Sequence, residues 1–313
     1  MYDIIVIGGG PAGLTAAVYA RRAGKSVVVI EKDTFGGQIT FSPKVENIPG
    51  FAAVSGNEFA ERLVDQAISQ DVEFESATVE KAELVEDPLR EDALNGRYFR
   101  VTTEDGEFEG KTLIIATGAK HRTLGLPGDE DFIGDGVSFC AVCDGAFYKD
   151  QDVGLVGGGN SALQEAVLLA GVVRKLTIFQ DLPYLTGEVK LQEELAKRDN
   201  VEVVTGVHVV SYLPGGNFSG ITVEKTETGE RKDYKLDGLF VAIGLVPQNE
   251  IFKDLIRLDA RGYADADEST LTMTPGVFVA GDCRVKRVRQ VATAASDGAV
   301  AALRAADYLD GRG

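Results

Sequence analysis

The chain has 313 residues, of which 44% are hydrophobic and 26% charged, values typical of a soluble globular protein long enough for two domains. Its 32 basic and 49 acidic residues give a net charge of −17, which argues against nucleic acid and anionic membranes as partners. No apolar run approaches the roughly 20 residues of a transmembrane helix. The N-terminal segment has neither a basic region nor a cleavage site, so we expect a cytoplasmic protein without a signal peptide.

The first motif is a glycine-rich turn in a strand–turn–helix–strand pattern. Residues 3–7 form a short apolar run typical of a buried parallel strand, and the sequence GGGPAG at residues 8–13 follows. A helical pattern over residues 14–23 leads to a second apolar strand at residues 26–30, which ends in Glu31. This order predicts a dinucleotide-binding βαβ unit.

Each part of this unit has a chemical reason. Gly8 and Gly10 allow the backbone to approach a pyrophosphate, and the N-terminus of the following helix stabilises its negative charge. Glu31 can accept hydrogen bonds from ribose hydroxyl groups.

The pattern returns in the middle of the chain. Residues 153–156 read as a strand, GGGNSA at residues 157–162 as the turn, residues 162–173 as a helix and residues 176–179 as the next strand. Gln180 stands where Glu31 stands in the first unit. The sequence therefore predicts a second Rossmann-like unit.

The second unit does not match NADPH. A 2′-phosphate needs Arg or Lys after the second strand, but residues 179–188 contain no basic residue and two acids, Asp181 and Glu188. NADPH is therefore disfavoured, whereas NADH remains open because Gln180 or Asp181 could hold ribose hydroxyl groups.

Cys140 and Cys143 form a CxxC pair, the sharpest chemical signal in the chain. Such a pair can close a small disulfide, and Asp144 beside it can carry the proton of thiol–disulfide exchange. A zinc site would need a second pair of ligands at suitable spacing, so we expect no metal. Three residues remain, Cys283, His121 and His208, and we give none of them a catalytic role.

Other segments indicate how the chain is divided. Residues 112–118 and 238–244 read as strands that lead to crossings between two domains. Residues 274–282 read as a strand that ends in a Gly-Asp pair, and residues 291–309 as a helix rich in small side chains. The polar run at residues 87–96 predicts an exposed hairpin loop.

With these motifs in place, the chain resembles the low-molecular-weight thioredoxin reductases from end to end. The matching stretches are residues 8–13, 36–38, 45–50, 115–118, 140–145, 281–282 and 289–290. The resemblance implies an α/β fold with two Rossmann-like domains of the pyridine-nucleotide-disulfide oxidoreductase type, the second inserted in the first. It implies an FAD-binding domain at residues 1–118 and 247–313, a central CxxC domain at residues 119–246, and a homodimer.

The resemblance also implies roles for individual residues. Cys143 would be the thiol that faces the flavin, Cys140 would attack the disulfide of thioredoxin, and Asp144 would donate the proton. The segments near residues 117–120 and 243–247 would be hinges. The residues expected to hold FAD are Gly8, Gly10, Pro11, Ala12, Gly13, Glu31, Lys32, Gly37, Gln38, Asn47, Thr117, Gly118, Gly281, Asp282, Arg289 and Gln290.

One departure decides the expected electron donor. Members that use NADPH carry a run of His and Arg residues after the second nucleotide strand, whereas this chain has the acidic and apolar run that begins at Gln180. In this respect it is similar to the ferredoxin-dependent flavin thioredoxin reductases. We therefore expect electrons to pass from ferredoxin through FAD and the dithiol to thioredoxin.

Three alternatives remain open at this point. They are an NADH-dependent thioredoxin reductase, an oxygen-dependent oxidase of small-molecule dithiols, and a flavin-bound redox sensor. An acidic ferredoxin would need a basic patch on this acidic chain, and the basic run at residues 284–289 is the best candidate. The same run could instead bind FAD phosphate.

Overall fold

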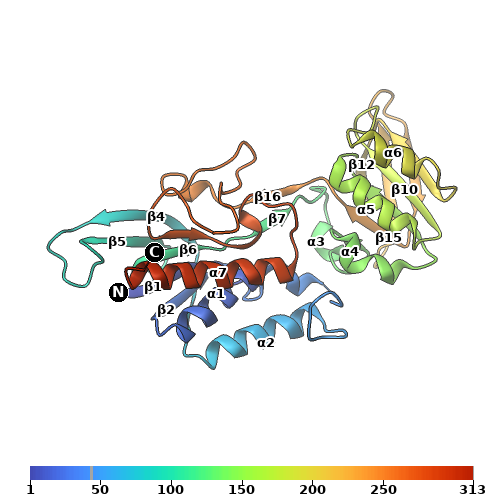
Figure 1. Cartoon of the computed structure of the whole chain (residues 1–313). Coiled ribbons are helices and arrows are strands. Elements are labelled where there is room, and N and C mark those ends of the chain that lie inside the picture. Colours follow the sequence, from blue (N-terminus) through green and yellow to red (C-terminus); the bar gives the residue numbers. More distant parts are fainter. Residues whose placement is uncertain (43–44, 313) are drawn as a thin grey trace. The chain divides into compact units, whose positions relative to one another are not determined.

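The computed structural model describes residues 1–42 and 45–312 (Figure 1). The chain divides into two compact units, residues 1–120 with 246–313 and residues 121–245. This division lies close to the expected domain boundaries. Residues 43, 44 and 313 of the expected FAD-binding domain lie outside the described part of the chain.

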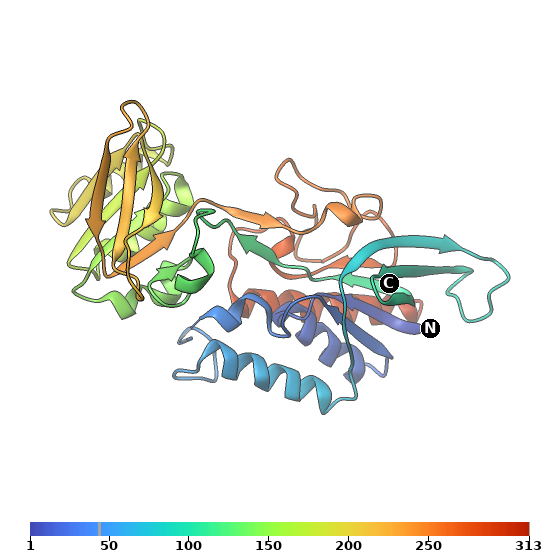
Figure 2. The same cartoon turned by 180° about the vertical axis from the view of Figure 1, so that it is seen from behind.

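The first unit is built on a seven-stranded sheet with the order β3–β2–β1–β6–β5–β4, in which β17 also pairs with β6. The strands are β1 (Tyr2–Ile7), β2 (Val27–Glu31), β3 (Glu73–Ser76), β4 (Val79–Glu86), β5 (Arg97–Thr103), β6 (Gly106–Ile115) and β17 (Val277–Val279). Pairing is parallel from β3 through β6 and at β17, and antiparallel in the β4–β5–β6 ribbon. The expected loop at residues 87–96 joins β4 to β5 and extends away from the sheet (Figure 2).

Both faces of this sheet are covered, as the continuous apolar strands predict. Ile4 and Val6 of β1 face one core cluster, and Ile5 and Ile7 face the other. The helices are α1 (Pro11–Arg22), α2 (Gly56–Ile68) and α7 (Val291–Leu309), and the last coincides with the predicted helix. Helices α1 and α7 run side by side along one face of the sheet (Figure 1). Small residues allow this approach, since a Cβ atom at Gly298 would lie 2.1 Å from Ala12 O.

The second unit has a five-stranded, parallel sheet with the order β11–β10–β9–β15–β8 and a three-stranded antiparallel sheet, β12–β13–β14. The strands are β8 (Val137–Ser138), β9 (Asp152–Val156), β10 (Lys175–Gln180), β11 (Val201–Thr205), β12 (Val207–Tyr212), β13 (Gly220–Lys225), β14 (Arg231–Lys235) and β15 (Gly238–Val241). The helices are α3 (Asp129–Phe132), α4 (Ala141–Asp144), α5 (Asn160–Ala170) and α6 (Val189–Leu195).

Two short strands join the units, β7 (Ala119–His121) and β16 (Leu245–Pro247), and they pair with each other. The described residues also form four 3-10 helices: η1 (Gly37–Phe41), η2 (Gly145–Tyr148), η3 (Glu250–Phe252) and η4 (Gly281–Cys283). The prediction of an α/β fold with one Rossmann-like unit inserted in another is confirmed. Within the described residues, no helix is long and apolar enough to cross a bilayer.

Candidate functional site

Cys140 and Cys143, the predicted redox pair, form a disulfide in the second unit. Cys140 precedes α4 as its N-cap residue, and the Cys143 N–H donates a hydrogen bond of 3.2 Å to Cys140 Sγ. Both cysteines are half-buried, and Val142 between them is 57% exposed. The CxxC turn therefore presents one side to incoming groups while the backbone of α4 supports the other.

Asp144 lies next to this disulfide, at the end of α4. Its Oδ2 accepts a 2.6 Å hydrogen bond from Ser138 Oγ, which in turn accepts one from the Cys140 N–H. Its Oδ1 is buried and has no hydrogen-bond partner among the described residues. Burial raises the pKa of Asp144, although the Ser138 hydroxyl opposes the shift. A carboxyl group in this setting holds a proton more readily than an exposed one and can pass it to a sulfur.

A second carboxyl group, Glu165, lies beside the CxxC turn, and the motifs did not reveal it. It projects from α5, and its Oε2 accepts a 3.4 Å hydrogen bond from the Ala141 N–H. Burial raises the pKa of Glu165 to about 7, although the Ala141 N–H lowers it in part. No sequence motif marks this residue, because only the packing of α5 on α4 brings it to the dithiol.

The second glycine turn, between β9 and α5, is packed with the chain's own side chains. Gln180 at the end of β10 is 7% exposed, and a Cβ atom at Gly158 would lie 2.6 Å from its Cδ. The N–H groups of Thr186 and Gly187 both donate to Gly158 O at 2.9 Å. The segment that follows β10 is therefore hydrogen-bonded back onto the glycine turn.

The acidic residue Glu188 also lies at the second glycine turn. The Glu188 N–H donates a 2.6 Å hydrogen bond to Asn160 Oδ1, and Asn160 Nδ2 donates to Glu188 Oε1 at 3.3 Å. Asn160 is the first residue of α5, the end of the helix at which a pyrophosphate would bind. A carboxylate at this end repels such an anion.

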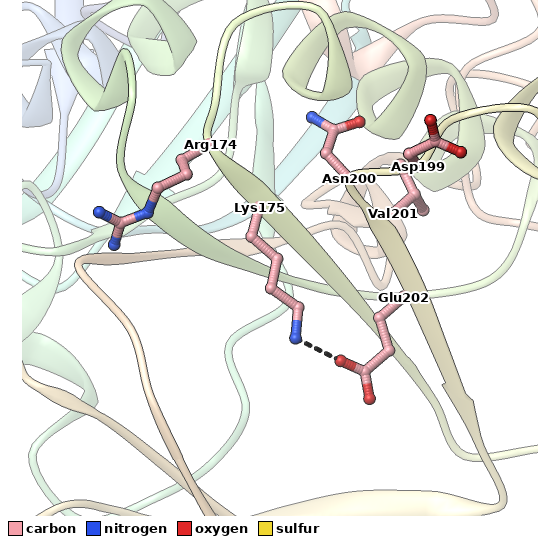
Figure 3. A pocket seen from close by; sticks show the side chains of 6 residues that line it. All are labelled: Arg174, Lys175, Asp199, Asn200, Val201 and Glu202. Carbon is pink, nitrogen blue, oxygen red and sulfur yellow. Dashed lines mark ion pairs between the residues drawn. The ribbon is translucent and has the colours of Figure 1, made fainter.

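A shallow hollow in the second unit is lined by Arg174, Lys175, Asp199, Asn200, Val201 and Glu202 (Figure 3). It lies at the amino end of β10, whereas ligands of open α/β sheets bind at the carboxyl ends of the strands. Most of its polar side chains already have partners. Lys175 Nζ is 2.6 Å from Glu202 Oε2, and Asn200 Nδ2 donates to two backbone carbonyls. We therefore do not regard it as the site.

The first glycine turn, between β1 and α1, is tightly built. A Cβ atom at Gly13 would lie 1.8 Å from Gly8 O, so only glycine fits there. The Gly9 N–H donates a 2.6 Å hydrogen bond to Glu31 Oε2, and the Gly36 N–H donates to Gly9 O at 2.7 Å. The fold thus brings the glycine turn, the end of β2 and the segment before η1 into contact.

Gly10 has room for a side chain, unlike the other glycines of this turn. The nearest atom to a Cβ at this position is Gly36 O at 4.0 Å, and its φ of −78° suits any residue. Protein packing alone therefore does not require glycine at 10. A dinucleotide whose pyrophosphate approaches the backbone here does require it.

Asn249 ties three segments of the first unit together, and no sequence motif pointed to it. Its side chain is 1% exposed, and its Nδ2 donates to Cys283 O at 2.7 Å and to Gly262 O at 2.9 Å. Its Oδ1 accepts a hydrogen bond from Thr117 Oγ1 at 3.2 Å. This one amide fixes the end of β6 relative to η4, the segment that carries Asp282.

Asp282 is a partly buried acid of the first unit. Its Oδ1 has no hydrogen-bond partner among the described residues, and burial raises its pKa to about 6 although nearby Lys286 and Arg289 oppose the shift. The Arg289 side chain donates to Asp282 O at 3.3 Å and lies over the Tyr263 ring. A buried carboxylate that lacks a partner fits a hydroxyl-bearing ligand, because such a ligand supplies donors.

The basic run at residues 284–289 is only partly available at the surface. Arg284 and Lys286 have side chains only 3% and 5% exposed, and both bind the carboxylate of Asp297. The interior of the unit uses these charges, so they cannot meet an acidic partner. Arg287 of the same run is exposed, so part of the run still lies at the surface.

The remaining residues expected to hold FAD lie around the first glycine turn and η4. Asn47 Nδ2 donates to Gln290 Oε1 at 3.0 Å, while Lys32 and Gln38 are exposed. The sixteen residues expected to hold FAD all belong to the first unit, and the three expected catalytic residues all belong to the second. Pro11 and Ala12 begin α1, Gly37 begins η1, Gly118 follows β6, and Gly281 begins η4.

Among the described residues, no three or more His, Cys, Asp or Glu side chains gather as metal ligands would. Cys283 is buried and reduced. His121 stacks on Phe139 with ring centroids 4.8 Å apart, and burial lowers its pKa to about 4, so it is neutral at physiological pH.

Comparison with known proteins extends these observations. The family described as pyridine nucleotide-disulphide oxidoreductase matches residues 2–298. A 34.2 kDa protein in the rubredoxin operon of Clostridium pasteurianum is 40% identical over 99% of this chain and 98% of its own length. Thioredoxin reductase of Bacillus subtilis is 36% identical over 99% and 95%. The crystal structure of thioredoxin reductase from Streptococcus pyogenes superposes with a TM-score of 0.90 at 39% identity, covering 99% of both chains.

The residues of the first unit fit FAD, the cofactor of such proteins. Its glycine turn leaves Gly10 open, Glu31 closes the turn, and Asp282 presents a buried oxygen without a partner among the described residues. The family profile spans almost the whole chain, and relatives and a solved structure well above 30% identity match it from end to end. The chain belongs to the pyridine nucleotide-disulphide oxidoreductases, and its cofactor is FAD.

Proposed function

We propose that this protein reduces the disulfide of thioredoxin, with reduced ferredoxin rather than NADPH as its electron donor. The observation that carries the donor assignment is the charge at the second glycine turn, where residues 179–188 include no basic residue and Glu188 lies at the N-terminus of α5. Gln180 lies against Gly158, and Thr186 and Gly187 are hydrogen-bonded to the same residue. A nicotinamide dinucleotide would bring its pyrophosphate next to the Glu188 carboxylate at the N-terminus of α5.

The acceptor follows from the dithiol and from the relatives. Two relatives carry the name thioredoxin reductase, and the CxxC turn with exposed Val142 suits a protein disulfide as substrate. The Cys140 thiolate would attack one sulfur of that disulfide, forming a mixed disulfide and releasing the other sulfur as a thiolate, which takes a proton from Asp144. The Cys143 thiolate would then attack Cys140 Sγ, which restores the enzyme disulfide and frees the second substrate thiol.

The first unit would hold the cofactor. We assign the ribose contact to Glu31 and the pyrophosphate approach to Gly8 and Gly10. Asp282 would accept hydrogen bonds from ribityl hydroxyl groups. When bound, FAD accepts single electrons and delivers a pair, which links a one-electron donor to a two-electron disulfide.

The choice of ferredoxin rests on the resemblance to ferredoxin-dependent reductases and on the absence of basic residues at the second turn. The family resemblance further supports a homodimer, and both proposed partners would be met in the cytoplasm. Sedimentation of the purified protein tests the dimer.

An anaerobic flavin-bleaching assay tests the donor. Purified holoenzyme receives NADPH, NADH or reduced ferredoxin in separate cuvettes, and oxidised thioredoxin follows. We expect bleaching by ferredoxin alone and return of the flavin colour with thioredoxin. Prompt bleaching by NADH or NADPH would overturn the donor assignment. Rapid oxygen consumption with a small dithiol, and no thioredoxin reduction, would identify a dithiol oxidase instead.

A substitution in the second glycine turn helps this assay to distinguish ferredoxin from a nicotinamide donor. Gly159 has a φ of −85°, and the nearest atom to a Cβ there is Thr186 Oγ1 at 3.8 Å, so the chain tolerates alanine. Gly159→Ala should leave ferredoxin-driven turnover unchanged. If a nicotinamide were the donor, the added methyl group would obstruct its pyrophosphate and slow turnover with that nucleotide.

A further inference from the structure

Glu165 and Cys140 are held by the same short turn. The Cys143 N–H donates to Cys140 Sγ at 3.2 Å, and the Ala141 N–H donates to Glu165 Oε2 at 3.4 Å. One backbone donor of the CxxC turn thus supports the sulfur, and another supports a carboxyl group that the proposed thiol–disulfide exchange does not use.

The charges of these two groups oppose each other. Once the disulfide is open, a thiolate on Cys140 is stabilised by the N–H groups around it. An ionised Glu165 adds negative charge to the same turn and raises the cost of that thiolate, whereas a neutral Glu165 does not.

We propose that Glu165 is a positioning residue that controls the protonation of Cys140, holding the thiol proton while Cys140 is the attacking thiolate. The inference rests on the dithiol chemistry of the proposed function. The S–H bond of Cys140 breaks and an O–H bond forms on Glu165 through solvent, so the net charge of the turn is unchanged. When the enzyme disulfide reforms, the proton leaves for solvent.

The surroundings of Glu165 support such a role. Its own pKa, raised by burial to about 7, allows both protonation states at physiological pH. Glu165 accepts directly from a backbone N–H of the turn, that of Ala141, whereas Asp144 is linked to the Cys140 N–H only through Ser138 Oγ.

No charged side chain of the described residues contributes to this shift, which arises from burial and the Ala141 N–H alone. The elements packed against α5 nevertheless carry titratable groups. These are Asp144 and the two thiols on and beside α4, Asp152 paired with Arg174, Lys175 paired with Glu202, and Lys190, Glu193 and Glu194 on α6.

The test is the pH dependence of Cys140 alkylation. Full-length holoenzyme is reduced with dithiothreitol, treated with iodoacetamide between pH 5.5 and 9, and the modified Cys140 peptide is followed by mass spectrometry. Glu165→Gln keeps the shape of the side chain and the acceptor for the Ala141 N–H but stays neutral. We expect Cys140 in E165Q to react about three- to tenfold faster than in wild type at pH 8 and equally fast at pH 5.5.

A purely structural Glu165 would give E165Q the wild-type profile at every pH, and that result would overturn the proposal. Glu193→Gln, which removes one exposed carboxylate from α6, should leave the profile unchanged. Glu165→Asp should retain a pH-dependent difference from E165Q, because it can still ionise. The alkylation assay uses neither ferredoxin nor thioredoxin. Its result therefore does not depend on whether the proposed electron donor and acceptor are correct.

Discussion

Arg284 and Asp297 form a bidentate ion pair in the interior of the first unit, with Nε 2.8 Å from Oδ2 and Nη2 2.9 Å from Oδ1. Lys286 Nζ adds a third contact at 2.9 Å, and the Gly281 N–H donates to the same carboxylate at 3.0 Å. Asp297 therefore connects α7 to η4 and fixes the segment that carries Asp282.

Asp297→Asn should destabilise the protein strongly. The change leaves two buried cations without a compensating charge, and breaking a buried pair in this way costs about 3–5 kcal/mol. Urea unfolding measures the loss. Asp307→Asn on the same helix removes only an exposed pair with Arg312 and should stay within about 1 kcal/mol of wild type. Equal stability of the two variants would contradict this account.

The same pair should make the protein acid-sensitive. Burial raises the pKa of Asp297, but hydrogen bonds from Arg284 and Lys286 outweigh it and leave the pKa below its ordinary value. The folded state thus binds this proton less readily than the unfolded state, whose aspartate pKa is about 3.9. The stabilisation is complete above that pKa and is lost as pH falls through the folded pKa. Stability curves of wild type and D297N should converge in acid.

Asn249→Ala should weaken both the fold and the retention of FAD. It removes the amide that joins Thr117, Gly262 and Cys283, leaves the part-buried Gly262 carbonyl without this donor, and should cost about 1–3 kcal/mol. Thermal unfolding and the flavin-to-protein absorbance ratio after dialysis measure the two effects. Asn217→Ala in an exposed loop serves as the control and should match wild type.

Gly10→Ala should separate cofactor binding from folding. Because a Cβ atom at 10 meets no protein atom closer than 4.0 Å, the apoprotein should unfold at the wild-type temperature. FAD titration should show affinity reduced at least tenfold, since the methyl group occupies the approach of the pyrophosphate. Gly13→Ala provides the contrast, because its Cβ would lie 1.8 Å from Gly8 O and the apoprotein itself should be destabilised. Wild-type FAD affinity in G10A would exclude this site.

Ser138→Ala should shift the pH dependence of thioredoxin reduction. Burial raises the pKa of Asp144, and the Ser138 hydroxyl partly opposes this, so removing the hydroxyl should raise the pKa further. The acid form of Asp144 then persists to higher pH, and the alkaline limb of the rate profile should move upward. Asp144→Asn should lose that limb and slow the reaction about 100-fold or more. An unshifted limb in S138A would assign it to another group.

Local sequence patterns are sufficient to predict much of this fold. The two glycine turns, the apolar strands beside them and helix α7 follow from hydrophobic periodicity and from residues whose roles are local. Glu31 is predictable for the same reason, because a fixed number of residues separates the glycine turn from the end of the next strand. The lack of basic residues in the segment after β10 likewise argues against NADPH on the order of amino acids alone.

Tertiary structure decides the rest. Glu165 and Asn249 become functional candidates only because helix packing and chain crossings bring them to Ala141 and Thr117, contacts that no periodicity encodes. The basic run at residues 284–289 has the composition of a surface patch, yet Arg284 and Lys286 turn inward to Asp297. The identity of a charged residue is the same whether its side chain is exposed to water or paired with a buried carboxylate. Its burial and its ion-pair partner are therefore known only from the folded structure.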